Sequence, residues 1–262
     1  MGATRGWKKL LFTIILHHSA SFSCEENRPD ANNTELLSPA HAAAVALKQR
    51  ISGAQLLAWE RLERKRAASN STALSIIQLG GSMAAGVDCV DDEFGVGKAC
   101  SYSARFARSM AMVADAPINI TYHNRAMGGT TTAGVLPQLE LLLTGGTSLS
   151  RKASPDIILV DFSVNDRFEE QDWVDPKGSK APGRGDDKTA VAEKEAKVFA
   201  ASEALLRYVL ERHPLSCVVI VEAFCENGSF SRRAHKRAAL LYGVAFVAYS
   251  QLLANGCSAL DI

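Results

Sequence analysis

The sequence predicts a single α/β domain built on a parallel β-sheet. Three apolar runs, at 74–79, 118–123 and 156–162, have the length of buried strands, and each precedes a stretch with helical periodicity. Such a strand–helix order favours parallel strands, because a parallel pair needs a crossover connection. With 262 residues, 47% of them hydrophobic, the chain is long enough to bury a full core.

Helices are expected before the first strand and between the later ones. Residues 38–66 form the first, with apolar positions on one stripe at Leu47, Ile51, Ala54, Ala58 and Leu62. The helices after the first two strands carry Tyr102, Phe106, Met110 and Val113, and then Val135, Leu136, Leu139, Leu142 and Leu143. A later helix turns Val191, Val198, Leu205, Leu206 and Val209 inward, and strands four and five are expected at 217–223 and 244–249.

The first strand stops at two glycines and a serine. Gly80 and Gly81 supply the small residues that a sharp bend needs, and a helix is expected to begin near Met83. Open α/β sheets bind ligands at this carboxyl edge, where helix-end N–H groups favour negative charge. Ser82 is therefore placed as a nucleophile would be, although Gly-Gly-Ser is also an ordinary turn.

Two further strand ends strengthen the functional interpretation. The second strand leads into residues 124–131, which contain Gly129, and the third leads into residues 163–166, which contain Asn165. Because parallel strands end on one edge, Ser82, Gly129 and Asn165 are expected to meet there. A hydroxyl, an unhindered glycine N–H and an amide side chain are the parts of a nucleophile with an oxyanion hole.

These three blocks resemble the first three sequence blocks of the SGNH (GDSL-type) hydrolases. The resemblance covers roughly residues 74–250 and rests on 80–83, 124–129 and 164–166. It implies a three-layer flavodoxin-like fold with five parallel strands and hydrolysis of an ester or thioester. It also implies that Ser82 is the nucleophile, and that the N–H groups of Ser82 and Gly129 and the amide of Asn165 bind the oxyanion.

The chain departs from the family pattern at three places. Gly81 replaces the Asp of the name motif, Ser163 replaces a usual Gly, and the last block, Asp-x-x-His after the fifth strand, is absent. Asp261 is a candidate for the acid of that block, with the histidine beyond the last residue. We therefore expect a C-terminally incomplete domain that lacks hydrolase activity as given, or a domain that has lost its base.

None of the histidines is predicted to be the base. His17 and His18 belong to the leader and His41 to the N-terminal extension. His123 precedes the oxyanion glycine, and His213 sits at a helix end, where a cationic ring favours the dipole. His235 lies among Arg232, Arg233, Lys236 and Arg237 and is expected to face solvent.

The N-terminus has the pattern of a secretory signal peptide. A basic segment precedes the apolar run 10–16, and small residues follow to Ser23, which predicts cleavage after that residue; a short signal-anchor is the alternative. We expect a signal peptide at 1–23, a helical extension at 24–70 and the SGNH-like domain at 71–262. Sequons at Asn32, Asn70, Asn119 and Asn227 fit a secreted glycoprotein.

The six cysteines fit an oxidising compartment, and their pairing is open among 15 patterns. Cys89 and Cys100 flank a short loop and are predicted to pair, whereas Cys217 lies in a strand and is predicted to be a buried thiol. No Cys or His spacing supports a metal site, and no cofactor is expected. A net charge of +1 argues against a nucleic-acid-binding surface.

Three functions stay open. The first is a secreted esterase, with acetyl groups on carbohydrate as one substrate class. In that case the polar loop between 167 and 188 lines the substrate site and Trp173 stacks on a sugar; the alternative is a solvated loop. The second is a non-catalytic protein that binds a glycan or ester. The third, a nucleotide binder, is disfavoured because Val87 and Asp88, rather than Lys and Ser or Thr, follow Gly86.

Overall fold

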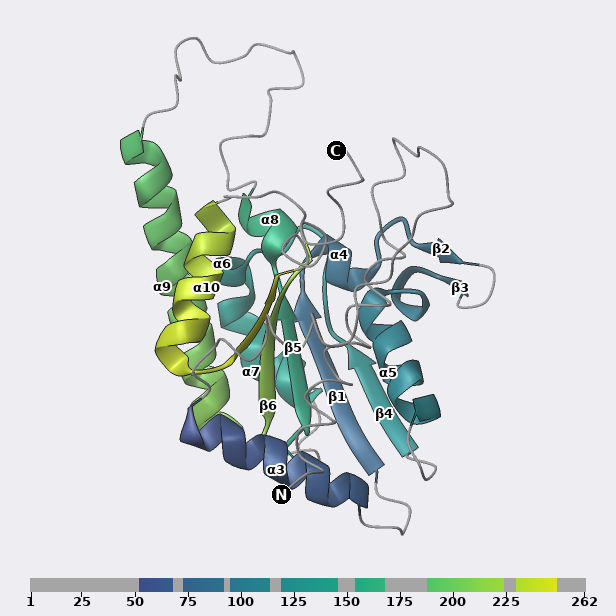
Figure 1. Ribbon diagram of the computed structural model, residues 1–262. Coiled ribbons are helices and arrows are strands. Elements are labelled where there is room, and N and C mark those ends of the chain that lie inside the picture. The colour runs from purple at the N-terminus through teal and green to yellow at the C-terminus, as the bar shows by residue number, and fades with distance from the viewer. Residues whose placement is uncertain are drawn as a thin grey trace, which may run out of the picture.

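A five-stranded parallel sheet forms the centre of the molecule (Figure 1). The computed structural model describes residues 52–67, 73–91, 95–113, 119–145, 154–167, 188–223 and 230–248. The strands run in the order β4-β1-β5-β6-β7 and comprise β1 (Ala73–Gly80), β4 (Asn119–Asn124), β5 (Ile157–Asp161), β6 (Cys217–Glu222) and β7 (Ala245–Ala248). This is the flavodoxin-like order expected from the resemblance, and it confirms all five predicted strands.

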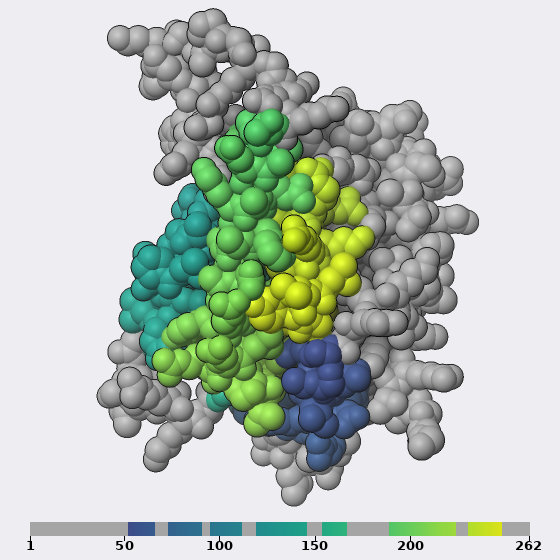
Figure 2. All heavy atoms as spheres, turned by 90° about the vertical axis from the view of Figure 1, so that its left-hand side faces the viewer, coloured from purple at the N-terminus to yellow at the C-terminus, as the bar shows by residue number. Residues whose placement is uncertain are grey.

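Helices cover both faces of the sheet. One face packs against α3 (Gly53–Ala67), α4 (Ser82–Ala85) and α5 (Tyr102–Val113). The other face packs against α6 (Thr132–Val135), α7 (Leu139–Thr144), α9 (Lys188–Arg212) and α10 (Phe230–Tyr242), with a 3-10 turn, η3 (Leu136–Gln138), between α6 and α7. Figure 2 shows α9 in green and α10 in yellow lying side by side on the outer surface.

The burial of each strand explains its sequence pattern. Every residue of β5 and β6 is buried, because helices cover both faces, so these strands are apolar almost throughout. The edge strand β4 instead alternates between exposed and half-buried positions. The three inner strands, β1, β5 and β6, therefore supply most of the sheet's contribution to the core.

Helix α3 is part of the domain core. Ala58, Trp59 and Leu62 are buried against the sheet. The buried Gln55 side chain donates to Ser216 O (3.0 Å) and accepts from Val218 N (2.9 Å), which fixes the helix against the start of β6. The inward stripe differs from the predicted one, because Ala54 is exposed and Gln55 takes its place.

The later helices follow the prediction with two differences. In α9, Val198, Leu205, Leu206 and Val209 are buried as expected, but Val191 is 38% exposed because it lies on the solvent side of the first turns. The segment after β5 forms a short helix, α8 (Ser163–Arg167). A small antiparallel pair, β2 (Val90–Asp91) and β3 (Gly95–Val96), follows α4.

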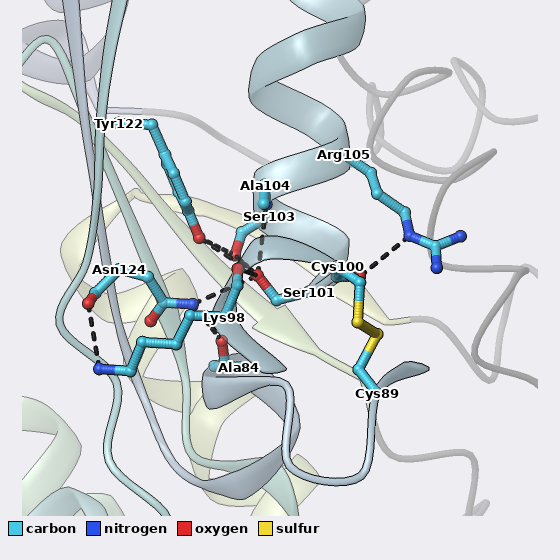
Figure 3. Close-up of a disulfide and its surroundings, with 10 residues drawn as sticks. All are labelled: Ala84, Cys89, Lys98, Cys100, Ser101, Ser103, Ala104, Arg105, Tyr122 and Asn124. Carbon is cyan, nitrogen blue, oxygen red and sulfur yellow. Dashed lines mark hydrogen bonds between the residues drawn. A yellow bond between two sulfur atoms is a disulfide. The ribbon is translucent and has the colours of Figure 1, made fainter. Parts of the chain in front are cut away.

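Cys89 and Cys100 form a disulfide, which confirms the predicted pair (Figure 3). The bond links the segment after α4 to the turn that precedes α5, with a Cα–Cα distance of 6.0 Å. Cys217 is a free, buried thiol in β6, also as predicted. The disulfide therefore fixes the chain immediately after the β1–α4 turn.

Several predictions fall on residues outside the described ranges. These are the leader 1–23, most of the extension 24–70, Trp173 with its loop, Asp261, and the sequons other than that of Asn119, which is exposed at the start of β4. Among the helices that the structure describes, none has both the length and the apolar character to span a lipid bilayer.

We predict that replacing both disulfide cysteines, as Cys89→Ala with Cys100→Ala, lowers the free energy of unfolding by about 2–3 kcal/mol, since the bond closes a short loop. Urea denaturation of the double variant and of the parent chain measures this difference. Equal midpoints and slopes would show that the bond does not constrain the unfolded chain.

Candidate functional site

The turn between β1 and α4 depends on two glycines. A Cβ at Gly80 would overlap the carbonyl oxygen of Asp161 and the Cβ of Ala84, so only glycine fits between β1 and the end of β5. The amide of Gly81 donates to Asp161 O at 2.9 Å. This close approach brings the first residue of α4, Ser82, beside the segment that follows β5.

Ser82 and Asn165 meet at the carboxyl edge of the sheet. The Ser82 hydroxyl donates a hydrogen bond to Asn165 Oδ1 at 2.9 Å, although 83 positions separate the two residues. A Cβ at Gly81 would lie 2.8 Å from Cγ of Asn165, so the glycine makes room for the amide. The juxtaposition that the sequence predicted for these two residues is thus present, and Gly81, a departure from the family pattern, has a steric role in it.

The amide nitrogen of Asn165 has no partner among the described residues. Asn165 is 9% exposed, and its Nδ2 is buried without a hydrogen bond. An unsatisfied buried donor costs free energy, so such groups call for an explanation. A donor held in this state beside a serine hydroxyl is available to a ligand oxygen.

Gly129 lies in the loop that leaves β4 at the same edge. The amide of Met127 donates to Gly80 O at 2.9 Å, which ties this loop to the β1–α4 turn. The Asn124 side chain donates to Ala84 O at 2.8 Å (Figure 3). It also accepts from Ala126 N at 3.0 Å, so it holds the loop against α4. Gly129 has φ +77°, a conformation that suits glycine.

Helix α4, which begins at Ser82, is too short to have a large macrodipole. Helix α4 has four residues and ends at Gly86, which adopts the left-handed conformation (φ +69°) and donates its N–H to Met83 O. Individual N–H groups at the turn, rather than a helix macrodipole, are therefore available to a developing negative charge. Gly86 ends the helix, which explains this glycine without a phosphate loop.

A buried acid supports the end of β5. Asp161 accepts hydrogen bonds from Ser163 N (3.1 Å) and Oγ (2.7 Å) and from the Tyr102 hydroxyl (3.1 Å). Burial raises the pKa of Asp161 to about 6, although these hydrogen bonds favour the charged form. Ser163, the second departure from the family pattern, thus satisfies a buried carboxyl group.

His235 is buried, and the prediction that it faces solvent is wrong. Its side chain packs inward from α10 and is 4% exposed, with Nδ1 2.8 Å from Glu222 Oε2 and Nε2 2.8 Å from Asp166 Oδ2. Asp166 also accepts hydrogen bonds from the amide (2.7 Å) and the hydroxyl of Thr132. This inward orientation was not predicted, because several residues near His235 in the sequence are charged.

A sequence signal for the inward face did exist. The buried residues of α10 are small and recur three or four positions apart: Ser231, Ala234, His235, Ala238 and Ala239. This spacing places His235 on the packed side of the helix. No local pattern around Glu222 or Asp166 indicates that they contact His235, because His235 lies on α10, a different segment of the sequence.

The other described histidines are not placed to act on Ser82. His213 follows α9 near the amino end of β6, where its Nδ1 lies 3.3 Å from Ser154 Oγ, and burial lowers its pKa, contrary to the expected cationic role. His123 is an exposed residue of β4. Within the described ranges, no imidazole forms a hydrogen bond with Ser82, and no group of three Asp, Glu, His or Cys residues is arranged to hold a metal ion.

Comparison with known proteins supports the fold. No protein-family model and no curated protein matches the sequence. The structure is similar to that of CEX, a two-domain esterase active on acetylated mannans, with 22% identity and a TM-score of 0.51 over 82% of this chain and 47% of that one. This chain therefore spans about half the length of that esterase. At this identity the likeness shows a shared fold, which agrees with the three-layer α/β fold expected from the sequence.

Two further solved structures are similar at lower scores. One is a GDSL-like lipase from Parabacteroides merdae, with 16% identity and a TM-score of 0.48 over 71% of this chain and 82% of that chain. The other is the acetylxylan esterase Axe2 from Geobacillus stearothermophilus, with 16% identity and a TM-score of 0.46 over 74% and 86%.

The raised pKa of Asp161 predicts a pH-dependent stability. The folded state holds this proton up to about pH 6, whereas the unfolded carboxyl ionises near 3.8, so the folded state binds more protons between these values. The proton of Asp161 therefore makes its full contribution to the free energy of unfolding below pH 3.8, and this contribution is lost as the pH rises through about 6. The free energy of unfolding falls by about 3 kcal/mol over this range. Asp161→Asn should remove this loss.

Urea denaturation at about pH 3 and about pH 7.5 tests the prediction, because the window between them spans both pKa values. The stability of Asp161→Asn relative to the parent chain should rise across the window. If the free energies of unfolding of the two chains instead change by the same amount between the two pH values, the raised pKa of Asp161 is contradicted.

Proposed function

We propose that the chain is a serine esterase of the SGNH type that cleaves an ester through an acyl-Ser82 intermediate. The observation that carries the proposal is the hydrogen bond between Ser82 and Asn165 at the carboxyl edge of the sheet. A hydroxyl beside an unpartnered, buried amide donor is the local arrangement that acyl transfer needs.

The roles follow from the chemistry of each group. Ser82 Oγ attacks the acyl carbonyl, and the carbonyl oxygen becomes an oxyanion. The N–H groups of Ser82 and Gly129 and Nδ2 of Asn165 donate hydrogen bonds to it. Collapse of the intermediate expels the alcohol and leaves acyl-Ser82, which water then hydrolyses to the acid and free serine.

The proton of Ser82 needs an acceptor. Both ring nitrogens of His235 face carboxylates, and neither His123 nor His213 contacts Ser82 among the described residues. We therefore assign the base to a group outside the described residues, where Asp261 remains the candidate for its partner acid.

For the substrate, we propose an acetyl ester on a carbohydrate. The support is the fold that the chain shares with CEX, which acts on acetylated mannans; this is an argument by analogy of fold. We further propose that the chain enters the secretory pathway, which is supported by the signal-peptide pattern and by the disulfide between Cys89 and Cys100.

A second candidate is a non-catalytic protein that binds a glycan or ester at the same edge. The lack of an imidazole contact to Ser82 within the described ranges favours it. In that case Ser82 and Asn165 would donate hydrogen bonds to a bound ester without forming a covalent intermediate. Ligand binding without turnover would distinguish this candidate from the esterase.

We predict that, in a chain that carries the base, Ser82→Ala abolishes turnover of 4-nitrophenyl acetate while leaving the fold intact, because the variant lacks the attacking oxygen. A fluorophosphonate probe should phosphonylate Ser82 of the parent chain, with loss of fluoride, and leave the variant unlabelled. Ser154→Ala, a change at a partly exposed serine on the opposite edge, is the matched control and should keep turnover. Turnover by Ser82→Ala at the same measurable rate as the parent would end the esterase proposal.

We predict that Asn165→Ala lowers kcat by about 10²–10³-fold, the usual loss for one oxyanion donor. Steady-state kinetics should show little change in KM, since the donor acts on charge that develops in the transition state. Full activity in this variant would exclude Asn165 from the oxyanion site.

Binding of an acetylated manno-oligosaccharide without hydrolysis, measured by calorimetry, would instead support the non-catalytic candidate.

A further inference from the structure

We propose that His235 is a positioning residue that, through Asp166, holds Asn165 and the Gly129 loop together at the candidate oxyanion site. The inference rests on the proposed function for its catalytic consequence. It concerns a buried cluster formed by Glu222 at the end of β6, His235 on α10 and Asp166 on α8. All three side chains are at least 95% buried.

The two contacts of the imidazole define its state. Nδ1 lies 2.8 Å from Glu222 and Nε2 lies 2.8 Å from Asp166, so each ring nitrogen can donate to a carboxylate only if both carry a proton. Burial by itself lowers the pKa of His235, but the charge of Glu222 and the hydrogen bonds to both carboxylates outweigh it and raise the pKa to about 10. Both ring nitrogens can therefore donate at once, one to Glu222 and one to Asp166.

Asp166 connects this ring to the candidate site. It directly follows Asn165 in α8, so the orientation of its side chain and that of the Asn165 backbone are coupled. Its carboxylate also accepts from the amide and hydroxyl of Thr132, the first residue of α6. Thr132 stands three positions after Gly129, so a single carboxylate joins the two segments that carry Asn165 and Gly129.

Two hydrogen bonds fix the orientation of the ring, one at each nitrogen. His235 also lines a small cavity together with Thr132, Ser202 and Phe162. The outward residues of α10 take no part, because Arg233 pairs with Glu195 at 2.8 Å and Arg237 lies over the Phe199 ring of α9.

The cluster is better explained by positioning than by stability. A buried ion pair loses much of its attraction to desolvation, and an apolar replacement of similar size is often as stable. Glu222 Oε1 is in addition buried without a partner among the described residues. What the cluster supplies is a fixed arrangement of α8, α6, β6 and α10, which meet through the contacts of Asp166 and His235.

The test compares His235→Gln with Arg233→Gln, a matched loss of a cationic side chain on the outer face of the same helix. His235→Gln should lower kcat on 4-nitrophenyl acetate about 10–100-fold with KM unchanged, because small displacements of catalytic groups have effects of this size. Arg233→Gln should keep the parent kcat. Added to Asn165→Ala, His235→Gln should have a smaller effect than alone, since part of its effect acts through the Asn165 donor.

A second measurement does not depend on turnover. In amide NMR spectra of the full chain, the Thr132 N–H, which donates to Asp166, should shift upfield in His235→Gln. The N–H of Gly134, which donates to Thr131 Oγ1 in the same helix, should not move. Glu222→Gln, which removes the charge with little change of shape, should shift the Thr132 signal in the same direction and serves if His235→Gln does not fold.

The outcomes separate the two proposals. If the parent chain hydrolyses no ester and the Thr132 shift occurs, the proposed function fails and the positioning role stands. An unchanged Thr132 signal in a folded His235→Gln or Glu222→Gln chain overturns the positioning role. So does a loss of kcat by His235→Gln that is as large with Asn165→Ala as without it.

Discussion

The close approach of β1 and β5 at Gly80 is the constraint on which the candidate site depends. With no side chain at position 80, the strand ends can lie against each other, and the Gly81 amide can donate to Asp161 O. That hydrogen bond sets the start of α4 beside the start of α8. Ser82 and Asn165 can form their hydrogen bond only because this distance is short.

A second layer of polar groups fixes the backbone on which these residues stand. Asp161 accepts hydrogen bonds from Ser163 and Tyr102. Asn124 links α4 to the loop after β4, and Asp166 links α8 to α6. Each is a buried or half-buried side chain with several partners, and each bridges segments that are far apart in the sequence. The carboxyl edge is consequently held by directional hydrogen bonds, whereas the rest of the sheet is held by apolar packing.

The disulfide and α3 anchor opposite ends of the same sheet. The bond between Cys89 and Cys100 constrains the chain just after α4, on the side of the candidate site. Gln55 of α3 completes the hydrogen bonds of Ser216 and Val218 at the amino end of β6. Helix α3 therefore belongs to the folded domain and shields strand ends that would otherwise leave backbone groups unpaired.

The sequence by itself determined the five strands, their parallel direction and the meeting of Ser82 with Asn165, because apolar runs of strand length and glycines at their ends are local signals. It also identified Cys89 and Cys100, which are close along the chain. Only the tertiary structure decided the environment of His235. Its basic neighbours suggest a solvated helix face, whereas its partners Glu222 and Asp166 come from β6 and α8. The ionisation and role of a buried group depend on such non-local partners, which local sequence patterns do not encode.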